Sequence, residues 1–347
     1  MKKIKTSALD RLFAAIAATR ELYLPVRHEK EVSYTLWSEG VQYAADALNT
    51  VKSPKGLFFP QSEDLYAMKT AEGGRKIELI DNGYKGGAFA VFGVRACDAA
   101  SLEVLDRVFL SDPADAYYKA RREAGVVISV ACSEPDASCF CHTFGIDNAA
   151  PAGDVSCIFA GDELYLDAKT EKGEAFIASL ALPELTDAAE ADVTAAESAR
   201  DTARANMAKT PLYDLTTEGF GAGKTAELFD SPKWAELSEA CLGCGTCTFV
   251  CPTCQCYDIR DYDTGRGIQR YRCWDSCMYS GFTIMSAGQP RLTQVERFRQ
   301  RFMHKLVYYP ENNEGVFSCV GCGRCVNKCP QALNIVKVMR ALGKESK

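Results

Sequence analysis

The chain has 347 residues, 47% hydrophobic and 25% charged, so it has the composition of a globular protein with enough apolar material for a sizeable core. Its net charge of −6 argues against nucleic acid as the main partner, because no basic excess exists to neutralise phosphates. Seventeen cysteines stand beside only three histidines. In a long chain with cysteines at metal-ligand spacings, this excess indicates metal binding rather than a disulfide framework.

The N-terminal segment predicts an amphipathic helix rather than a targeting signal. Its short apolar run, 12–18, is preceded directly by Asp10 and Arg11 and is closed by Thr19 and Arg20. No apolar run in the sequence approaches the length of a membrane span. We therefore expect no membrane span and a location in a reducing cytoplasm.

Residues 1–185 show a mixed pattern of strands and helices. Apolar runs predict buried strands at 56–59, 88–94 and 126–131. Helical patterns lie at 99–110 and 114–123. Because the strand runs are continuous rather than alternating, we expect an α/β domain whose sheet is covered on both faces.

Four cysteines follow two of these predicted strands. Cys97 comes after the strand at 88–94, Cys132 ends the strand at 126–131, and Cys139 and Cys141 follow within ten residues. If the two strands are neighbours, the four sulfurs converge at the carboxyl ends of the sheet, where open α/β sheets place their sites. Buried or free thiols remain the alternative, since cysteine packs well as a small hydrophobe. The spacing alone leaves both open.

A boundary follows the first domain. Residues 187–208 are rich in Ala, Glu, Asp and Arg, which predicts an exposed or linking helix. The next segment is irregular and contains Gly219, Gly221 and Gly223. We therefore predict an α+β protein in three parts, namely an α/β domain with a cluster-binding edge at 1–210, a linker at 211–234, and a helical domain at 235–347 that contains a two-cluster ferredoxin module with a long insertion.

Two C-x2-C-x2-C-x3-C-P runs dominate the last part. The first has Cys241, Cys244, Cys247 and Cys251, and the second has Cys319, Cys322, Cys325 and Cys329. Three thiolates at this spacing bind a [4Fe–4S] cluster from one loop, while the fourth cysteine of such a run ligates the other cluster in two-cluster ferredoxins. The expected ligand sets are Cys241, Cys244, Cys247 and Cys329 for one cluster, and Cys319, Cys322, Cys325 and Cys251 for the other.

A zinc-stapled scaffold without a redox role is the alternative for these runs, and it would suit a single C-x2-C. Two complete four-cysteine runs, each followed by proline and neither containing histidine, favour iron–sulfur clusters instead. Gly245 and Gly323 within the runs are expected to let backbone N–H groups approach the cluster sulfurs, which raises the reduction potential.

The insertion between the runs, 260–305, is basic. It carries Arg266, Arg270, Arg272, Arg291, Arg297, Arg299 and Arg301. These side chains either form a solvated helix face with ordinary ion pairs, or balance anionic clusters and dock an acidic partner protein. The sequence does not choose between the two.

Several motifs together resemble one family of iron–sulfur subunits. They are V-R-A-C-D at 94–98, C-S-E-P at 132–135 with C-F-C at 139–141, C-P-T-C-Q-C at 251–256, and W-D-S-C at 274–277. The family includes the beta subunit of archaeal sulfhydrogenases and an iron–sulfur subunit of anaerobic sulfite reductase. Similar subunits occur in flavin oxidoreductase modules that supply heterodisulfide reductase. The resemblance runs from about residue 92 to residue 338 and is weakest before residue 55 and across 160–230.

This resemblance implies a third [4Fe–4S] cluster, held by Cys97, Cys132, Cys139 and Cys141. It also implies two partners for an anaerobic complex, a flavoprotein that oxidises NAD(P)H or is similar to ferredoxin reductase, and a catalytic redox subunit. No G-x-G-x-x-G follows any predicted strand, so flavin and NAD(P) are expected on the partner.

The favoured function is therefore an electron-transport subunit of an oxidoreductase complex, with no substrate site of its own. The alternative is a self-contained iron–sulfur reductase with a substrate or flavin site in the N-terminal domain. Cys254, Cys256, Cys273 and Cys277 stay unassigned as a fourth cluster, a substitute ligand or packed thiols. Cys157 is expected to be a buried thiol.

Overall fold

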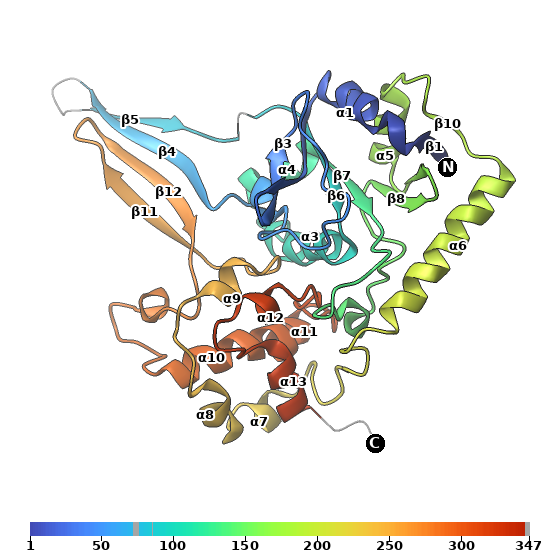
Figure 1. Ribbon diagram of the computed structural model, residues 1–347. Helices are drawn as coiled ribbons and strands as arrows, with labels where there is room; N and C mark the ends of the chain where they lie inside the picture. The colour runs from blue at the N-terminus through green and yellow to red at the C-terminus, as the bar shows by residue number, and fades with distance from the viewer. Residues whose placement is uncertain (72–75, 85, 344–347) are drawn as a thin grey trace.

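The computed structural model describes residues 1–71, 76–84 and 86–343. Two sheets and a group of C-terminal helices organise the chain (Figure 1). The larger sheet lies above the helices in this view, and the smaller one forms an arm at the left. Among the described residues, no helix combines the length and apolar character that crossing a membrane requires.

The larger sheet has eight strands in the order β10-β1-β9-β8-β7-β6-β2-β3. Its four central strands, β8, β7, β6 and β2, pair in parallel, and the flanking strands pair antiparallel. The strands are β1 (Lys2–Lys5), β2 (Glu21–His28), β3 (Glu31–Leu36), β6 (Phe89–Val94), β7 (Gly125–Val130), β8 (Val155–Ala160), β9 (Glu163–Ala168) and β10 (Thr186–Asp187).

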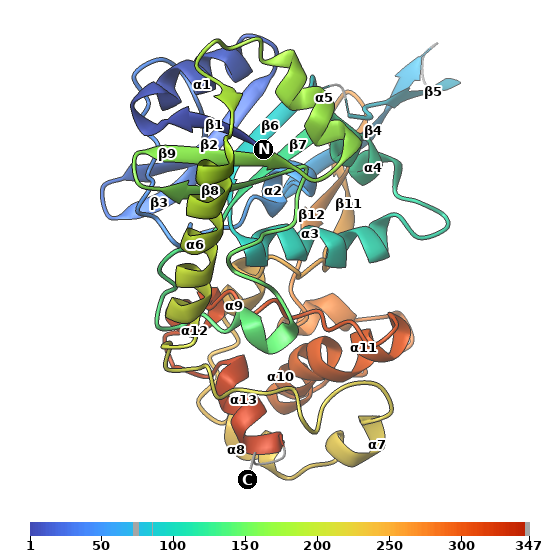
Figure 2. The same cartoon turned by 90° about the vertical axis from the view of Figure 1, so that its right-hand side faces the viewer.

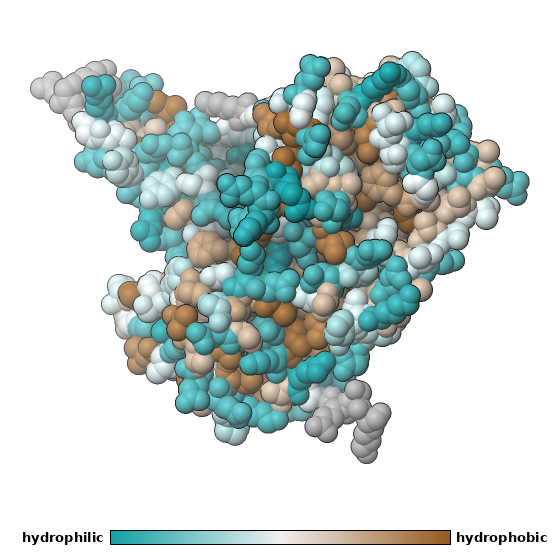
Figure 3. Space-filling model, in the orientation of Figure 1, coloured by the Kyte–Doolittle hydropathy of each residue, from teal (hydrophilic) through white to brown (hydrophobic). Residues whose placement is uncertain are grey.

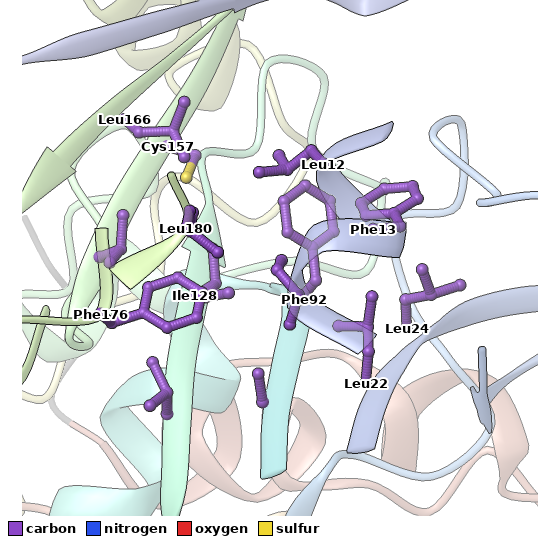
Figure 4. Packing of buried hydrophobic residues seen from close by; sticks show 14 of the residues in the cluster. Leu12, Phe13, Leu22, Leu24, Phe92, Ile128, Cys157, Leu166, Phe176 and Leu180 are labelled. Carbon is purple, nitrogen blue, oxygen red and sulfur yellow. The ribbon is translucent and has the colours of Figure 1, made fainter. Parts of the chain in front are cut away.

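Helices cover both faces of this sheet, as predicted. On one face, α1 (Leu9–Ala17) and α5 (Glu171–Ser179) pack Phe13 and Phe176 against Phe92 and Ile128 (Figure 4). Cys157 lies fully buried in the same core, which confirms it as a buried thiol. The other face is covered by α2 (Lys55–Phe58), α3 (Ala96–Phe109) and α4 (Ala116–Ala124). Every residue of β6 and β7 is buried, because both faces of these strands are packed.

The predicted strands at 88–94 and 126–131 and the two predicted helices are confirmed by β6, β7, α3 and α4. The predicted exposed helix is α6 (Glu190–Met207), which packs along β8 through Ala196 (Figure 2). The strand predicted at 56–59 is wrong, because this segment forms helix α2. A short apolar run has no distinguishing period, and here Pro54 starts a helical turn that buries Phe58 and Phe59.

The smaller sheet joins segments from both ends of the chain. It has the antiparallel order β11-β12-β4-β5, with β4 (Ser62–Ala71), β5 (Lys76–Asp81), β11 (Tyr257–Asp263) and β12 (Ile268–Trp274). The insertion between the ferredoxin runs therefore contains a hairpin that a helical C-terminal domain did not predict. Arg272 anchors it, since its guanidinium pairs with Glu63 at 2.6 Å and both side chains are 3% exposed.

The remaining helices surround a second core. They are α7 (Thr225–Leu228), α8 (Lys233–Ser238), α9 (Thr246–Phe249), α10 (Gln294–Met303), α11 (Tyr309–Asn312), α12 (Arg324–Lys328) and α13 (Ile335–Leu342). A capping box between Thr293 and Glu296 starts α10, which continues into a π-helical turn at His304–Tyr308. Helix α3 lies between the large sheet and these helices (Figures 1 and 2). Its residue Val104 accepts a hydrogen bond from the Tyr309 hydroxyl at 2.8 Å.

Candidate metal centres

The cysteines of the first predicted set line one cavity. Cys241, Cys244 and Cys247 come from the loop that leads into α9, and Cys329 follows α12. Leu242, Met278 and Arg301 are among the other residues that line this cavity. Cys244 is exposed, so this set reaches the surface. The structure thus brings all four predicted residues together around one cavity.

Hydrogen-bond donors already point at sulfurs of this set. The Leu333 N–H donates to Cys329 Sγ at 3.3 Å, and Gln294 Nε2 donates to Cys241 Sγ at 3.4 Å. Hydrogen bonds to ligand sulfurs are one of the ways in which a protein tunes an iron–sulfur cluster. Gly245 has a φ of +72°, and a Cβ there would lie 2.6 Å from the Tyr279 hydroxyl. Glycine is therefore required here by the close approach of Tyr279 as well as by the turn.

The second predicted set is deeper. Cys322 and Cys251 are buried, and Cys319 and Cys325 are half-buried. Burial raises the pKa of Cys322 to about 12, and the nearby sulfurs of Cys251 and Cys325 contribute to this rise, so the three side chains lie together. Cys319 is likewise close to Cys325 and Cys251. The structure therefore gathers this set too, including the cysteine contributed by the other run.

Buried cations lie between the two sets. Arg301, 2% exposed, donates from Nη2 to the Cys247 carbonyl at 2.7 Å, while its Nε and Nη1 have no partner among the described residues. Burial opposes its charge, but Cys247 and then Cys325 raise the pKa of Arg301 well above its ordinary range. Lys305 donates to Thr253 Oγ1 at 2.8 Å, and Cys251 and Cys254 raise its pKa in spite of burial.

No described carboxylate forms an ion pair with Arg301 or Lys305. A buried cation without a counter-charge is strongly unfavourable. A four-iron cluster held by four thiolates carries net negative charge, so it would supply the missing partner. The donor set, the cavity and the orphaned guanidinium atoms therefore fit [4Fe–4S] clusters. The basic insertion contains residues of both predicted kinds. Arg301 lies beside the cysteine sets, where it can balance anionic clusters, whereas Arg270 forms an ordinary ion pair with Asp261 at 2.6 Å.

The N-terminal set lies at the carboxyl ends of β6 and β7, which are adjacent and parallel. Cys97 opens α3, Cys132 follows β7, and Cys139 and Cys141 lie in the next loop. Burial and then Cys132 raise the pKa of Cys139 to about 11. The pKa of Cys141 is raised by burial, Cys132 and Cys139, and Cys141 in turn lies near Cys97. These four residues are therefore also brought together.

A buried arginine accompanies this set as well. Arg95 donates to the carbonyls of Ala131 at 2.9 Å and Ala47 at 2.7 Å, and it lies close enough to Cys132 to oppose the rise in the pKa of that thiol caused by burial. It is 7% exposed and forms no ion pair with any carboxylate that the structure describes. The same combination of gathered cysteines and an unpaired buried cation thus recurs at a third place in the chain.

The N-terminal set packs directly against the second run. The Phe140 N–H donates to the Gly321 carbonyl at 2.9 Å, and a Cβ at Gly323 would lie 2.3 Å from Ser138 Oγ. Asp98, next to Cys97, pairs with Arg324 through two contacts of 2.6 and 2.7 Å. Cys97 and Cys322 are close enough for each sulfur to affect the other's charge. Cys247 and Cys325 stand in the same relation between the two runs.

The unassigned cysteines separate into two groups. Cys254 lies close enough to Cys251, and Cys277 close enough to Cys256, for each to shift the pKa of its neighbour, and Cys254 lies near Cys277. Cys273 lies apart on β12, where its charged neighbours are Arg260, Asp258 and Asp275. A fourth centre made of the four cysteines at 254, 256, 273 and 277 is therefore not assembled.

Sequence reasoning named Arg301 within the basic insertion but missed Arg95, Lys305 and Arg324 as buried cations beside the cysteine sets. A signal for Lys305 was present, since it interrupts an apolar stretch between Met303 and Leu306. Arg324 also stands inside the second run, between two cysteines. His142 stands beside Cys141 in the sequence, and its Nε2 lies 3.0 Å from the Tyr213 carbonyl oxygen.

Comparison with known proteins agrees with this geometry. A 4Fe-4S dicluster domain matches residues 240–333, which span both runs and the hairpin between them. Sulfhydrogenase 2 subunit beta of Pyrococcus furiosus is 30% identical over 340 residues, covering 97% of this chain and 96% of the relative. The chain belongs to the sulfhydrogenase beta subunit family. The resemblance seen in the cysteine motifs is thereby confirmed, and the chain is an iron–sulfur protein of the 4Fe–4S electron-transport class within a family of oxidoreductase subunits.

Proposed function

We propose that this chain is an electron-transfer subunit that relays electrons between a flavoprotein partner and a catalytic redox subunit. The partner would oxidise NAD(P)H or be similar to ferredoxin reductase, and the catalytic subunit would be of the hydrogenase, sulfite reductase or heterodisulfide reductase type. The main support for the proposal is that the three cysteine sets form a row. The N-terminal set adjoins the second-run set through Cys97 and Cys322, and that set adjoins the first-run set through Cys325 and Cys247.

We assign each set as the ligands of one [4Fe–4S] cluster, which supplies one-electron transfer when bound. The residues are Cys97, Cys132, Cys139 and Cys141; Cys319, Cys322, Cys325 and Cys251; and Cys241, Cys244, Cys247 and Cys329. The division of this chain into an α/β domain at 1–210, a linker at 211–234 and a dicluster domain at 235–347 belongs to the same proposal.

The chain's own side chains support a relay in three ways. Arg95, Arg301 and Lys305 place positive charge beside the sets without a described carboxylate to cancel it, which stabilises anionic cofactors and their reduced forms. Burial of the second-run set keeps water away from the middle of the row. At the end of the row, Cys244 is exposed beside Leu242, which is 64% exposed and so available to a partner.

Hydrophobic residues also emerge on the surface around the C-terminal helices, in the lower part of Figure 3. Leu292 is 74% exposed and Ile284 is 65% exposed, and both belong to the segment between β12 and α10. Exposed apolar side chains beside a redox site suit a surface that a partner subunit covers.

Metal analysis of anaerobically purified protein tests the ligand assignment. The intact chain should contain about 12 iron atoms and a matching amount of acid-labile sulfide. Cys139→Ser should lower this to about 8 iron atoms, whereas Cys273→Ser, a matched cysteine variant away from the three sets, should leave the content unchanged. Iron near 8 in the intact chain, with no further loss in Cys139→Ser, would refute the third site.

Reduction of the isolated chain tests the relay. Dithionite should bleach the visible absorbance, whereas NAD(P)H alone should not, because its oxidation is assigned to a partner. Bleaching by NAD(P)H without a partner would contradict the relay and favour a self-contained reductase. A tagged chain recovered from its native cells should bring with it a flavoprotein and a catalytic redox subunit in stoichiometric amounts.

A further inference from the structure

Thr253 lies where three parts of the chain meet, and it is 1% exposed. It belongs to the turn at 251–254, which follows the first ferredoxin run and leads toward β11. Its Oγ1 lies 3.3 Å from Cys251 Sγ, 2.8 Å from Lys305 Nζ and 2.5 Å from the Ser318 carbonyl oxygen. A hydroxyl group has one proton to donate, so Thr253 cannot donate to the sulfur and to the carbonyl at the same time.

Two of these neighbours, Lys305 and Ser318, are held against each other. Lys305 lies in the π-helical turn His304–Tyr308, and Ser318 directly precedes Cys319, the first cysteine of the second run. The Ser318 N–H donates to the Lys305 carbonyl at 3.2 Å, and Lys305 Nζ donates to the Ser318 carbonyl at 3.2 Å. Both residues are buried. The π-helical turn is therefore fixed to the start of the second run, and it directs the ammonium group toward Thr253.

The Thr253 hydroxyl proton has a better acceptor than Ser318 once Cys251 is a ligand. An iron-bound cysteine sulfur has lost its proton, so it can only accept hydrogen bonds. It also carries negative charge, and hydrogen bonds to ionised acceptors are stronger than those to neutral ones. The Ser318 carbonyl keeps Lys305 as a donor when the Thr253 proton points to the sulfur. Because an ammonium group can only donate, Lys305 occupies a lone pair of the Thr253 oxygen and leaves the hydroxyl proton for Cys251.

We propose that Thr253 is a positioning residue for the second-run cluster, whose hydroxyl donates to Cys251 Sγ and extends the influence of the Lys305 charge to that sulfur. This inference rests on the proposed function, which assigns Cys251 as a ligand. Donation from Lys305 polarises the hydroxyl and strengthens the bond that the hydroxyl gives to the sulfur. The reduced cluster is more negative than the oxidised one, so a hydrogen bond to its ligand stabilises the reduced form and raises the reduction potential. Thr253 thus makes the middle cluster of the row easier to reduce.

An anaerobic EPR redox titration of the full, cluster-loaded chain tests this role. The signal that Cys322→Ala abolishes identifies the second-run cluster. Thr253→Val removes the hydroxyl but keeps the branched shape, and Thr253→Ala removes both. Each should raise the ratio of oxidised to reduced cluster at the parent midpoint by about threefold to tenfold, which is the effect of one hydrogen bond. At about 59 mV per factor of ten for one electron, the potential should become more negative by about 30–60 mV. Thr253→Ser keeps the hydroxyl and should titrate as the parent does.

Thr248→Val is the matched control. Thr248 is 2% exposed, and its hydroxyl contacts the Gly245 carbonyl at 2.7 Å and Ser276 Oγ at 2.8 Å rather than a sulfur. This variant should leave the second-run potential at the parent value.

Iron content is measured on the same samples, which separates this inference from the proposed function. The role of Thr253 is overturned if Thr253→Val or Thr253→Ala, with full iron content, titrates at the parent potential. It is also overturned if Thr253→Ser shifts as far as they do, because the shape of the side chain would then be the cause. Loss of about four iron atoms in the hydroxyl-free variants overturns it too, since Thr253 would then be needed to hold the cluster. A parent chain without the signal that depends on Cys322 would refute the ligand assignment itself.

Discussion

The ion pair between Asp98 and Arg324 offers a direct test of how the two parts of the chain are held together. It connects helix α3 to helix α12 across 226 residues of sequence, with side chains 1% and 2% exposed. Arg324 also donates from Nε to the Thr50 carbonyl at 2.9 Å. We consider two neutral replacements, the isosteric Asp98→Asn and the shorter Arg324→Gln, each of which leaves the opposite charge buried.

Breaking a buried pair by removing one partner costs about 3–5 kcal/mol. The two changes should not cost the same. Arg324→Gln leaves the Asp98 carboxylate beside Cys97, and once Cys97 is a thiolate bound to a cluster, two negative charges face each other there. Asp98→Asn leaves Arg324 beside Cys322, which favours the cation. We therefore expect about 5 kcal/mol for Arg324→Gln and about 3 kcal/mol for Asp98→Asn.

Anaerobic urea denaturation followed by tryptophan fluorescence measures both values, from the shift of the midpoint at a common slope. The double variant should recover part of the loss, because no charge is left unpaired. Asp214→Asn serves as a control, since its pair with Arg340 is exposed and should contribute less than about 1 kcal/mol. A loss for Asp98→Asn equal to or larger than that for Arg324→Gln would refute the reasoning about the neighbouring thiolates.

Two further predictions concern single side chains. Burial, and then Lys305 and Arg291, lower the pKa of His304 to about 4. Because the unfolded chain takes up this proton near pH 6.5 and the folded chain only near pH 4, the free energy of unfolding should fall by about 1 kcal/mol between pH 7.5 and 5.5. His304→Gln should remove that part of the fall, and an equal fall in both proteins would disprove the assignment. The pKa of Cys251 is lowered, and the largest cause is a hydrogen bond with Cys254. Cys254→Ala should therefore make the potential of the second-run cluster more negative, by roughly 60 mV or less, in an EPR redox titration; an unchanged potential would show that this bond is absent in the loaded protein.

The features that follow local rules could be predicted from the sequence. Strands β6 and β7 stand out as continuous apolar runs, and their parallel pairing brings Cys97 and Cys132 to one edge of the sheet. The spacing within each ferredoxin run likewise indicates which cysteines share a loop. In each case the residues that decide the outcome lie within a few positions of one another or on neighbouring strands.

The features that depend on distant contacts could not be predicted. The sequence around Asp98 and around Arg324 contains no pattern that predicts their ion pair. This contact nevertheless holds the N-terminal cysteines beside the second run. The β11–β12 hairpin did have a local signal, a turn with Gly265 and Gly267 between segments rich in β-branched and aromatic residues. The strands also carry many charged side chains, because much of their surface is exposed, and these residues weaken the strand pattern. Arg272 is buried only because its partner Glu63 lies on β4, far away in the sequence.

Several buried cations of the described residues differ in their partners, and the difference agrees with the proposed clusters. Arg272, away from the cysteine sets, is buried with a carboxylate partner, and Arg324 pairs with Asp98 although it stands between two cysteines of the second run. Arg95, Arg301 and Lys305 are also buried and lie beside the gathered cysteines, yet no described carboxylate pairs with them. An acidic protein has carboxylates to spare, so a shortage of partners cannot explain the difference. These three cations are placed where anionic cofactors would be, and because each is unfavourable without one, cluster binding and the packing of the chain around these sites should stabilise each other.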